Sequence, residues 1–192
     1  MLDSPNRIAV ILILLAVLIS LTAGCSSQTQ YVPLDKRKLR GSGKVYFIPL
    51  GDFPKNTVTD LVGYYQEKYG LSIETLSELS IDSSVMNYER QQLIAEAAVT
   101  LMQRAYSSIS GSPDAIMIGL TKEDMYISEV SWQFAFSYRQ EGRFAVVSSA
   151  RMALDTAALD GRAQTRLRKM VTKNVGILYY RLPTSDNPRS VL

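Results

Sequence analysis

Apolar and polar positions along this chain form alternating blocks that predict strands and helices in turn. Residues 45–50 are a β-branched and aromatic run typical of a strand. Thr57 and Asp60 have the spacing of a capping box and predict the start of a helix that Gly70 ends. The apolar positions of that helix recur at helical spacing at Val58, Leu61, Val62 and Tyr65. A short strand is expected around residues 71–76.

The middle of the chain predicts a second long helix and then three strands. Helical periodicity covers residues 88–106, and the fully apolar residues 115–120 indicate a strand covered on both faces. Strand candidates at 132–138 and 143–149 flank residues 140–142, which have the composition of a hairpin turn.

A last helix is predicted over residues 162–180, with apolar positions on one side. The element order β-α-β-α-β-β-β-α indicates an α/β fold. We expect a single domain over residues 44–192, with a mixed, mostly parallel sheet flanked by helices.

The N-terminal block consists of an apolar run over residues 8–23, closely followed by Cys25. The sequence Leu-Thr-Ala-Gly-Cys that ends it resembles the lipobox of bacterial lipoproteins, in which the cysteine thiol takes the lipid. The resemblance implies a signal peptide over residues 1–24 and lipidation of Cys25, with membrane lipid as a partner. The alternative is an uncleaved anchor with an incidental cysteine.

Residues 25–43 are polar, contain Pro33 and two glycines, and predict a tether between the lipid and the domain. Four basic residues in it could also touch anionic headgroups, namely Lys36, Arg37, Lys38 and Arg40. Ser26 follows the cysteine where inner-membrane retention favours aspartate. We therefore expect an envelope location on the periplasmic face of the outer membrane.

Composition narrows the possible functions. The chain has 192 residues with 46% hydrophobic residues, enough for one ordinary core. Its net charge of +3 is mild and spread out, so nucleic acid is not an expected partner. Histidine is absent and Cys25 is the only cysteine, so few classical metal ligands are available.

Four stretches, taken in order, resemble the archaemetzincin family of metzincin-type zinc peptidases. They are residues 45–51, the Arg-Gln-Gln of residues 90–92, residues 118–126 with an Asp-Met-Tyr turn, and residues 145–152 with Val-Val-Ser before an arginine. The resemblance covers residues 44–192 and implies a metzincin-like α/β domain.

A fifth stretch bears on activity. The family carries His-Glu-x-x-His-x-x-Gly-x-x-His, in which the histidines hold zinc and the glutamate is the general base. Aligned without a gap, the histidine positions are Thr172, Gly176 and Leu182, and the glutamate position is Lys173. None of these can replace the family's residues, so the resemblance implies no metal, no other cofactor and no catalytic residue in this chain.

Two smaller features have alternative interpretations. The Tyr179 ring could fill the space that zinc and its ligands vacate, or it could be an ordinary aromatic near a helix end. Ser148, Ser149, Lys169 and Lys173 could supply a Ser–Lys hydrolase, but such residues are usually solvated.

The function best supported by the sequence is a non-catalytic pseudo-peptidase. We expect it to bind a peptide or an envelope protein by strand addition in the cleft beside residues 132–138. The alternatives are a zinc-dependent metallopeptidase, by analogy with the family, and a purely structural envelope lipoprotein. Enzymatic activity stays open at this stage.

Overall fold

A five-stranded sheet forms the centre of the computed structural model, which describes residues 39–152 and 161–184. All of these residues belong to the unit that begins at Lys36. The strand order is β2-β1-β5-β8-β7, and only β7 is antiparallel to its neighbour. The strands are β1 (Lys44–Leu50), β2 (Ile73–Thr75), β5 (Ala115–Thr121), β7 (Ser137–Gln140) and β8 (Phe144–Ser148). The predicted mixed, mostly parallel sheet is thereby confirmed.

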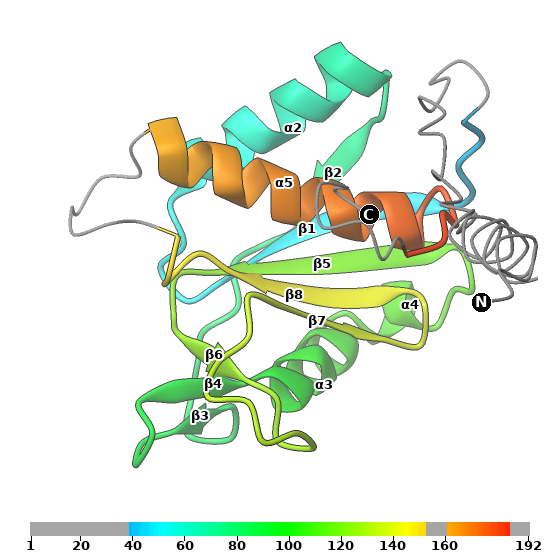
Figure 1. The fold of residues 1–192 in the computed structure, drawn as a ribbon. Helices are drawn as coiled ribbons and strands as arrows, with labels where there is room; N and C mark the ends of the chain where they lie inside the picture. Colours follow the sequence, from blue (N-terminus) through cyan, green and yellow to red (C-terminus); the bar gives the residue numbers. More distant parts are fainter. Residues whose placement is uncertain (1–38, 153–160, 185–192) are drawn as a thin grey trace, which may run out of the picture. The chain divides into compact units, whose positions relative to one another are not determined.

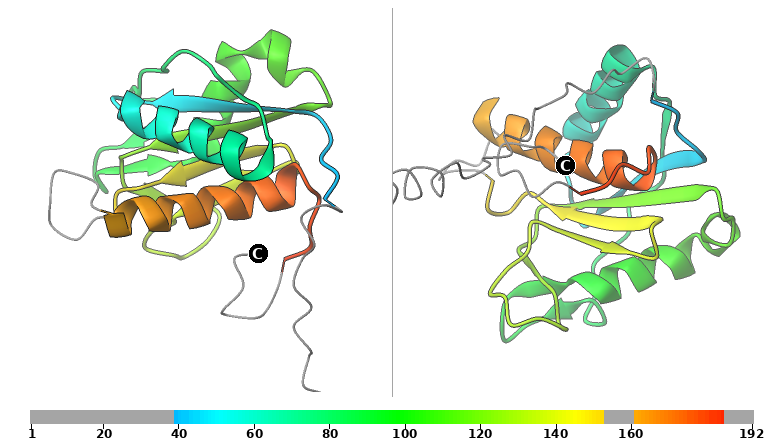
Figure 2. Two further views of the ribbon diagram at one scale, coloured as in Figure 1. Left: turned by 90° about the horizontal axis from the view of Figure 1, so that it is seen from above. Right: turned by 45° about the vertical axis from the view of Figure 1, so that its right-hand side comes forward.

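Helices cover both faces of this sheet (Figures 1 and 2). One face packs against α2 (Lys55–Tyr69) and α5 (Gly161–Leu178), and the other against α3 (Ala95–Ala105), which is followed by the short α4 (Ser107–Ser110). A second, three-stranded sheet of order β3-β4-β6 lies beside the N-terminal end of α3. Its strands are β3 (Met86–Asn87), β4 (Gln92–Ile94) and β6 (Met125–Tyr126).

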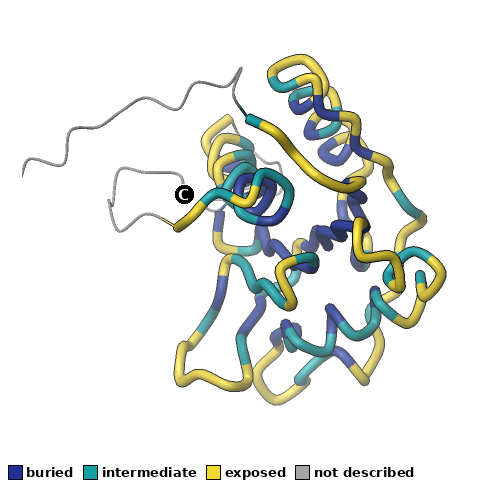
Figure 3. Tube along the Cα trace, turned by 90° about the vertical axis from the view of Figure 1, so that its right-hand side faces the viewer, coloured by how far each residue is buried: buried dark blue, intermediate teal, exposed yellow. Residues whose placement is uncertain are grey.

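The three inner strands carry the core, as their continuous apolar runs predicted. Every residue of β5 and β8 is buried, and alternate side chains serve the two faces. Ile118 belongs to the cluster formed with α2 and α5, whereas its neighbour Met117 belongs to the cluster formed with α3. Figure 3 shows the buried positions gathered at the centre, with exposed positions on the outer turns.

The prediction of one helix over residues 88–106 is wrong in its first part. Helix α3 begins at Ala95, and residues 92–94 form strand β4. The N–H of Leu93 donates to the carbonyl of Asp124 at 2.7 Å, and β4 pairs with both β3 and β6. Asp124 and β6 are distant from β4 in sequence, so local periodicity could not reveal this pairing.

The predicted beginnings of two other elements also differ. Helix α2 begins at Lys55 directly after Pro54, so Thr57 lies inside its first turn and does not cap it. Pro54 is the N-cap residue in an extended conformation, and no side chain caps the helix. Gly70 ends α2 in the left-handed conformation, as predicted. Strand β7 begins at Ser137, so most of the predicted strand 132–138 is loop.

The described end of the predicted tether contacts the domain. The N–H of Ser42 donates to the carbonyl of Tyr179 at 3.2 Å, and the N–H of Lys44 to that of Asp114 at 2.8 Å. Gly41 lies so close to the Tyr179 ring that a Cβ there would be 1.8 Å from a ring carbon. The chain is therefore held against the end of α5 before β1 begins.

Candidate functional site

Strand β7 is one of the two edges of the large sheet and pairs with β8 on one side only, whereas the other edge is the short β2. Strands β7 and β8 join through a turn in which Glu141 and Gly142 both have positive φ, and the N–H of Arg143 donates to the carbonyl of Gln140 at 3.2 Å. Two successive left-handed residues define a type I′ turn, whose twist suits a hairpin. The sequence predicted this hairpin turn.

The backbone of Ser137 and Arg139 faces the free edge. The N–H of Ser148 donates to the carbonyl of Phe136 at 3.0 Å, so Phe136 is a hydrogen-bonded position of the β7–β8 ladder. Such positions alternate along an antiparallel pair, which makes Tyr138 the next one. The N–H and C=O groups of Ser137 and Arg139 therefore point away from β8.

The side chains of Ser137 and Arg139 lie on the same face of the sheet as α5. Arg139 is paired with Ala145 and Ser137 with Val147, and both of these partners belong to the core cluster that packs against α5. Alternation along β7 places Tyr138 on the other face, against the α3 cluster.

Asn174 of α5 holds these two side chains. It is fully buried, and its amide nitrogen donates to Ser137 Oγ at 2.9 Å and to the Met170 carbonyl at 2.8 Å. Its Oδ1 accepts from Ser137 Oγ at 3.1 Å and from Arg139 Nη1 at 3.3 Å. A buried amide needs such partners, so this cluster fixes β7 against α5.

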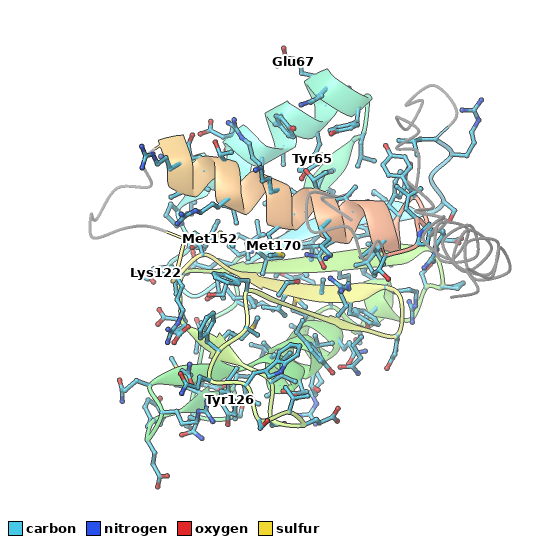
Figure 4. All side chains as sticks on the ribbon, in the orientation of Figure 1. Tyr65, Glu67, Lys122, Tyr126, Met152 and Met170 are labelled. Atoms are coloured by element: carbon cyan, nitrogen blue, oxygen red, sulfur yellow. The ribbon has the colours of Figure 1, made fainter. Side chains whose placement is uncertain are left out.

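Thr172, placed by sequence at a histidine position, lies on another side of α5. Its Oγ1 is 2.9 Å from the phenol oxygen of Tyr65 on α2, and Tyr65 also donates to the Arg168 carbonyl at 3.3 Å. Figure 4 shows Tyr65 between α2 and α5. Burial raises the pKa of Tyr65 well above its usual range. The side chain of Thr172 therefore faces α2, whereas that of Asn174 faces the edge strand β7.

The other three positions of the aligned motif lie near the end of α5. Gly176 is buried, and its carbonyl accepts from the N–H of Leu182 at 3.0 Å, which closes the helix. Lys173 and Leu182 are partly exposed. Tyr179, which was considered as a filler of the vacated site, contacts Gly41 and Tyr180.

The described residues do not fit a zinc ion. Zinc in proteins takes three or four nitrogen, sulfur or carboxylate ligands that converge in space. Among residues 39–152 and 161–184, no group of three or more His, Cys, Asp or Glu side chains is placed to hold a metal. The side chains that bond to Asn174 supply a hydroxyl and a guanidinium, and a guanidinium repels a cation.

Cys25, the predicted lipidation site, lies outside the described residues. In the part of the chain that the structure describes, no helix is both long and apolar enough to cross a membrane.

A second polar cluster supports the loop that leads into β7. Arg151 donates to both carboxylate oxygens of Asp124, at 2.8 and 2.7 Å, and this bond lowers the pKa of Asp124. Gln92 donates to the same carboxylate at 2.8 Å and to the carbonyl of Gln133 at 2.9 Å. Arg90 donates to Gln92 at 2.8 Å and to Gln133 at 3.0 Å, which completes the cluster.

Three of the sequence stretches that resemble archaemetzincins supply this cluster. Arg90 and Gln92 come from the stretch 90–92, Asp124 from 118–126 and Arg151 from 145–152. The Arg90 guanidinium also lies 4.0 Å from the centroid of the Tyr126 ring. The structure therefore gives these residues a shared role in holding residue 133 in front of the edge strand.

The loop itself carries exposed aromatic side chains. Trp132 is 62% exposed and Phe136 is 37% exposed, and the Phe134 ring packs edge-on against Phe136 at 5.4 Å. Arg151 stacks over Phe134 at 4.2 Å. This aromatic surface adjoins the N-terminal end of β7.

The serines considered for a Ser–Lys arrangement are engaged elsewhere. Ser148 Oγ donates to the Glu123 carbonyl at 2.6 Å, and Ser149 Oγ donates to the Thr121 carbonyl at 3.2 Å. Both serines are buried at the C-terminal end of β8, beside the end of β5. Their hydroxyls therefore close the turns that follow β5 and β8.

Comparisons with solved structures show which known proteins have a similar fold. Neither the family models nor the curated proteins that were compared gave a match. The structure is similar to archaemetzincin from Archaeoglobus fulgidus in complex with malonate, with a TM-score of 0.60 and 19% identity over 75% of this chain and 82% of that one. It is similar to archaemetzincin from Methanopyrus kandleri, with a TM-score of 0.57 and 20% identity over 84% and 83% of the two chains.

A zinc-dependent peptidase from Methanocorpusculum labreanum is also similar, with a TM-score of 0.61 and 16% identity over 77% of this chain and 86% of that one. The described domain thus has an archaemetzincin-like fold, the fold of zinc-dependent peptidases of that type, as the sequence predicted. At these identities the likeness concerns the fold alone.

Proposed function

We propose that this chain is a lipid-anchored envelope protein whose archaemetzincin-like domain binds an extended peptide or protein segment and does not hydrolyse it. The observation that carries the proposal is the edge strand β7, where no described residue pairs with the backbone groups of Ser137 and Arg139 that point away from β8. Unpaired strand edges bind extended segments by forming the missing ladder.

The rigidity of β7 supports this role. Asn174 of α5 is hydrogen-bonded to the side chains of Ser137 and Arg139. The Arg90–Gln92–Asp124–Arg151 cluster holds the loop that precedes the strand. An edge that is already fixed loses little conformational entropy when a peptide binds, and this favours affinity.

The donor set supports binding without hydrolysis. A zinc peptidase needs converging ligands and a general base beside the bound water. The aligned positions of this chain hold Thr172, Lys173, Gly176 and Leu182, and the helix residue that faces the edge strand is Asn174. An amide neither ionises nor accepts a proton at neutral pH, so it cannot act as the general base.

The membrane anchor rests on the N-terminal sequence. An apolar run that ends in Leu21, Thr22, Ala23, Gly24 and Cys25 favours lipidation of the cysteine, and acyl chains then hold the protein on the membrane. An envelope location would make exposed segments of other envelope proteins available as partners.

The proposal is tested with the full chain in detergent and a fluorescent library of extended octapeptides, by anisotropy. We expect binding that weakens about tenfold or more in Ser137→Pro and changes little in Ser137→Ala. Both variants remove the hydroxyl, but only proline removes the N–H at the free edge, and a strand's first residue tolerates proline. Equal affinity of the two variants, or cleavage of the peptides, would contradict the proposal.

A further inference from the structure

Arg139 brings a guanidinium to the free edge of β7 and leaves most of its hydrogen-bonding capacity unused. Its Nη1 donates to Asn174 Oδ1 at 3.3 Å. No ion pair joins it to a carboxylate of the residues that the structure describes. A guanidinium has five N–H donors, and a partly buried cation without a counter-charge is costly. Burial accordingly lowers the pKa of Arg139.

Two other arginines of the domain show how fully such a group can be partnered. Arg151 grips Asp124 with two donors, and Arg143 donates to the carbonyls of Ser110 and Ser112 while it stacks over Phe144. Arg139 instead has one long bond to a neutral amide that is shared with Ser137. Within the described residues, Arg139 therefore has N–H donors that are not used by a carboxylate.

The nearest acidic side chain in sequence is turned to another partner. Glu141 lies two residues further on, in the hairpin turn, and its Oε1 accepts from Gln140 Nε2 at 3.2 Å. Its φ of 53° places it in the left-handed region, where the chain turns back. It therefore does not continue the face of β7 on which Arg139 lies.

We propose that Arg139 recognises an acidic side chain of the extended segment that binds to β7. The inference rests on the proposed strand addition and specifies its ligand: a peptide with Asp or Glu at the position opposite Arg139. A planar guanidinium binds a carboxylate through two parallel bonds, a geometry that no other side chain offers as well.

Strand geometry makes this recognition depend on register. Because the backbone of Arg139 faces the free edge, the opposite residue of a peptide that adds antiparallel would exchange both backbone hydrogen bonds with it. Side chains on directly opposed residues point to the same face, with Cβ atoms about 5 Å apart. An acid at that position meets Arg139, whereas an acid one residue away lies on the other face of the sheet.

The test uses the full chain in detergent and a positional library of octapeptides with acetylated and amidated ends. Each sub-library fixes Glu, Gln or Lys at one position, and anisotropy measures the affinity. We expect Glu to exceed Gln about tenfold at one position and not at the next. The preference should fall below about twofold in Arg139→Gln and persist in part in Arg139→Lys, which keeps the charge but loses the fork.

The matched control is Arg104→Gln, since Arg104 is an exposed arginine in the last turn of α3. It should keep the full preference for Glu, and both glutamine variants should unfold at the wild-type temperature within a few degrees. Binding that ignores Glu at every position, or a preference that survives Arg139→Gln, would overturn the inference and leave strand addition standing. A second library with free C-termini is the further control, and a preference for Glu that appears only with a free C-terminal carboxylate would overturn it too. Failure of all peptides to bind would overturn both proposals.

Discussion

The phenol oxygen of Tyr65 on α2 lies 2.9 Å from the hydroxyl oxygen of Thr172 on α5. This bond joins the two helices that cover one face of the sheet, and Tyr65 is only 1% exposed. In this fold, therefore, Thr172 serves the interface between two helices.

The first prediction concerns the alkaline stability of this contact. The pKa of Tyr65 is raised by burial, so above pH of about 10 the unfolded chain releases this proton while the folded chain retains it. The stability that the proton contributes is full below that pH and is lost as pH rises. Urea unfolding should show a loss of up to about 1.4 kcal/mol per pH unit from this group.

Tyr65→Phe should flatten that alkaline loss and cost about 1 kcal/mol at pH 7 through the missing hydrogen bond. Tyr88→Phe is the control, because Tyr88 is 61% exposed. The same alkaline slope in wild type and Tyr65→Phe would show that the phenol is open to solvent.

The second prediction concerns the loop before the edge strand. Asp124→Asn removes the carboxylate that Arg151 and Gln92 share, so the loop at Gln133 should open more often. We expect amide exchange over residues 133–136 to rise about tenfold at pH 7, as the loss of one net hydrogen bond predicts. Asp52→Asn breaks an exposed ion pair with Lys122 and should leave this exchange unchanged.

The sign of the pH effect follows from the lowered pKa of Asp124. The contribution of this carboxylate to stability is present above pH of about 4 and is lost as the pH falls through the folded-state pKa. The free energies of unfolding of wild type and Asp124→Asn should therefore differ at pH 7 and converge as the pH is lowered. A difference in the free energy of unfolding that stays constant down to pH 2 would contradict this role of the Asp124 carboxylate.

The third prediction is that removal of metal ions does not change the unfolding temperature. Converging zinc ligands stabilise a fold directly, and their loss lowers the unfolding temperature. Full chain purified without a histidine tag should contain far less than one zinc per molecule. Its unfolding temperature should stay constant with a chelator or with added zinc. One zinc per chain retained through dialysis would disprove this.

The fourth prediction is that Cys25 carries the anchor. Cells given radioactive palmitate should label the wild-type chain and not Cys25→Ser, which should also keep its apolar leader and run larger on a gel. Ser26→Ala, at the adjacent position, should be labelled normally. Equal labelling of Cys25→Ser and wild type would refute lipidation at this residue.

The fifth prediction contrasts two glycines. Gly41→Ala puts a methyl group where the Tyr179 ring lies, 1.8 Å from a ring carbon, and should cost about 1 kcal/mol or more as the ring is displaced. Gly63→Ala lies within α2 with nothing within 4 Å of the new methyl group, and should stabilise by up to about 1 kcal/mol. Urea midpoints at unchanged slope measure both. A neutral Gly41→Ala would mean that the ring does not hold this segment.

The buried strands and the last helix were predictable because the pattern of apolar residues within each segment indicates its structure. Strands β1 and β5 are continuous apolar runs, and α5 shows helical periodicity over most of its length. Strand β4 was missed because its three residues are stabilised by Asp124 and β6, about thirty positions away, while their composition suits a helix.

The candidate site was harder to predict. Asparagine on a helix has no signature of its own, and Asn174 gains its role from Ser137, which only the folded sheet brings within reach. The Arg90–Gln92–Asp124–Arg151 cluster was visible as separate stretches of family resemblance. Its convergence on Gln133 required the pairing of β4 with β6.

The unpaired edge of β7 also bears on how copies of this protein avoid one another. A strand edge is a template for self-association, and natural sheets protect it by short length and by charge. Strand β7 has four residues with Arg139 among them, and a second copy adding antiparallel at the same register would bring two like charges together. Besides the role proposed for it in peptide recognition, Arg139 would thus also deter self-association through this edge.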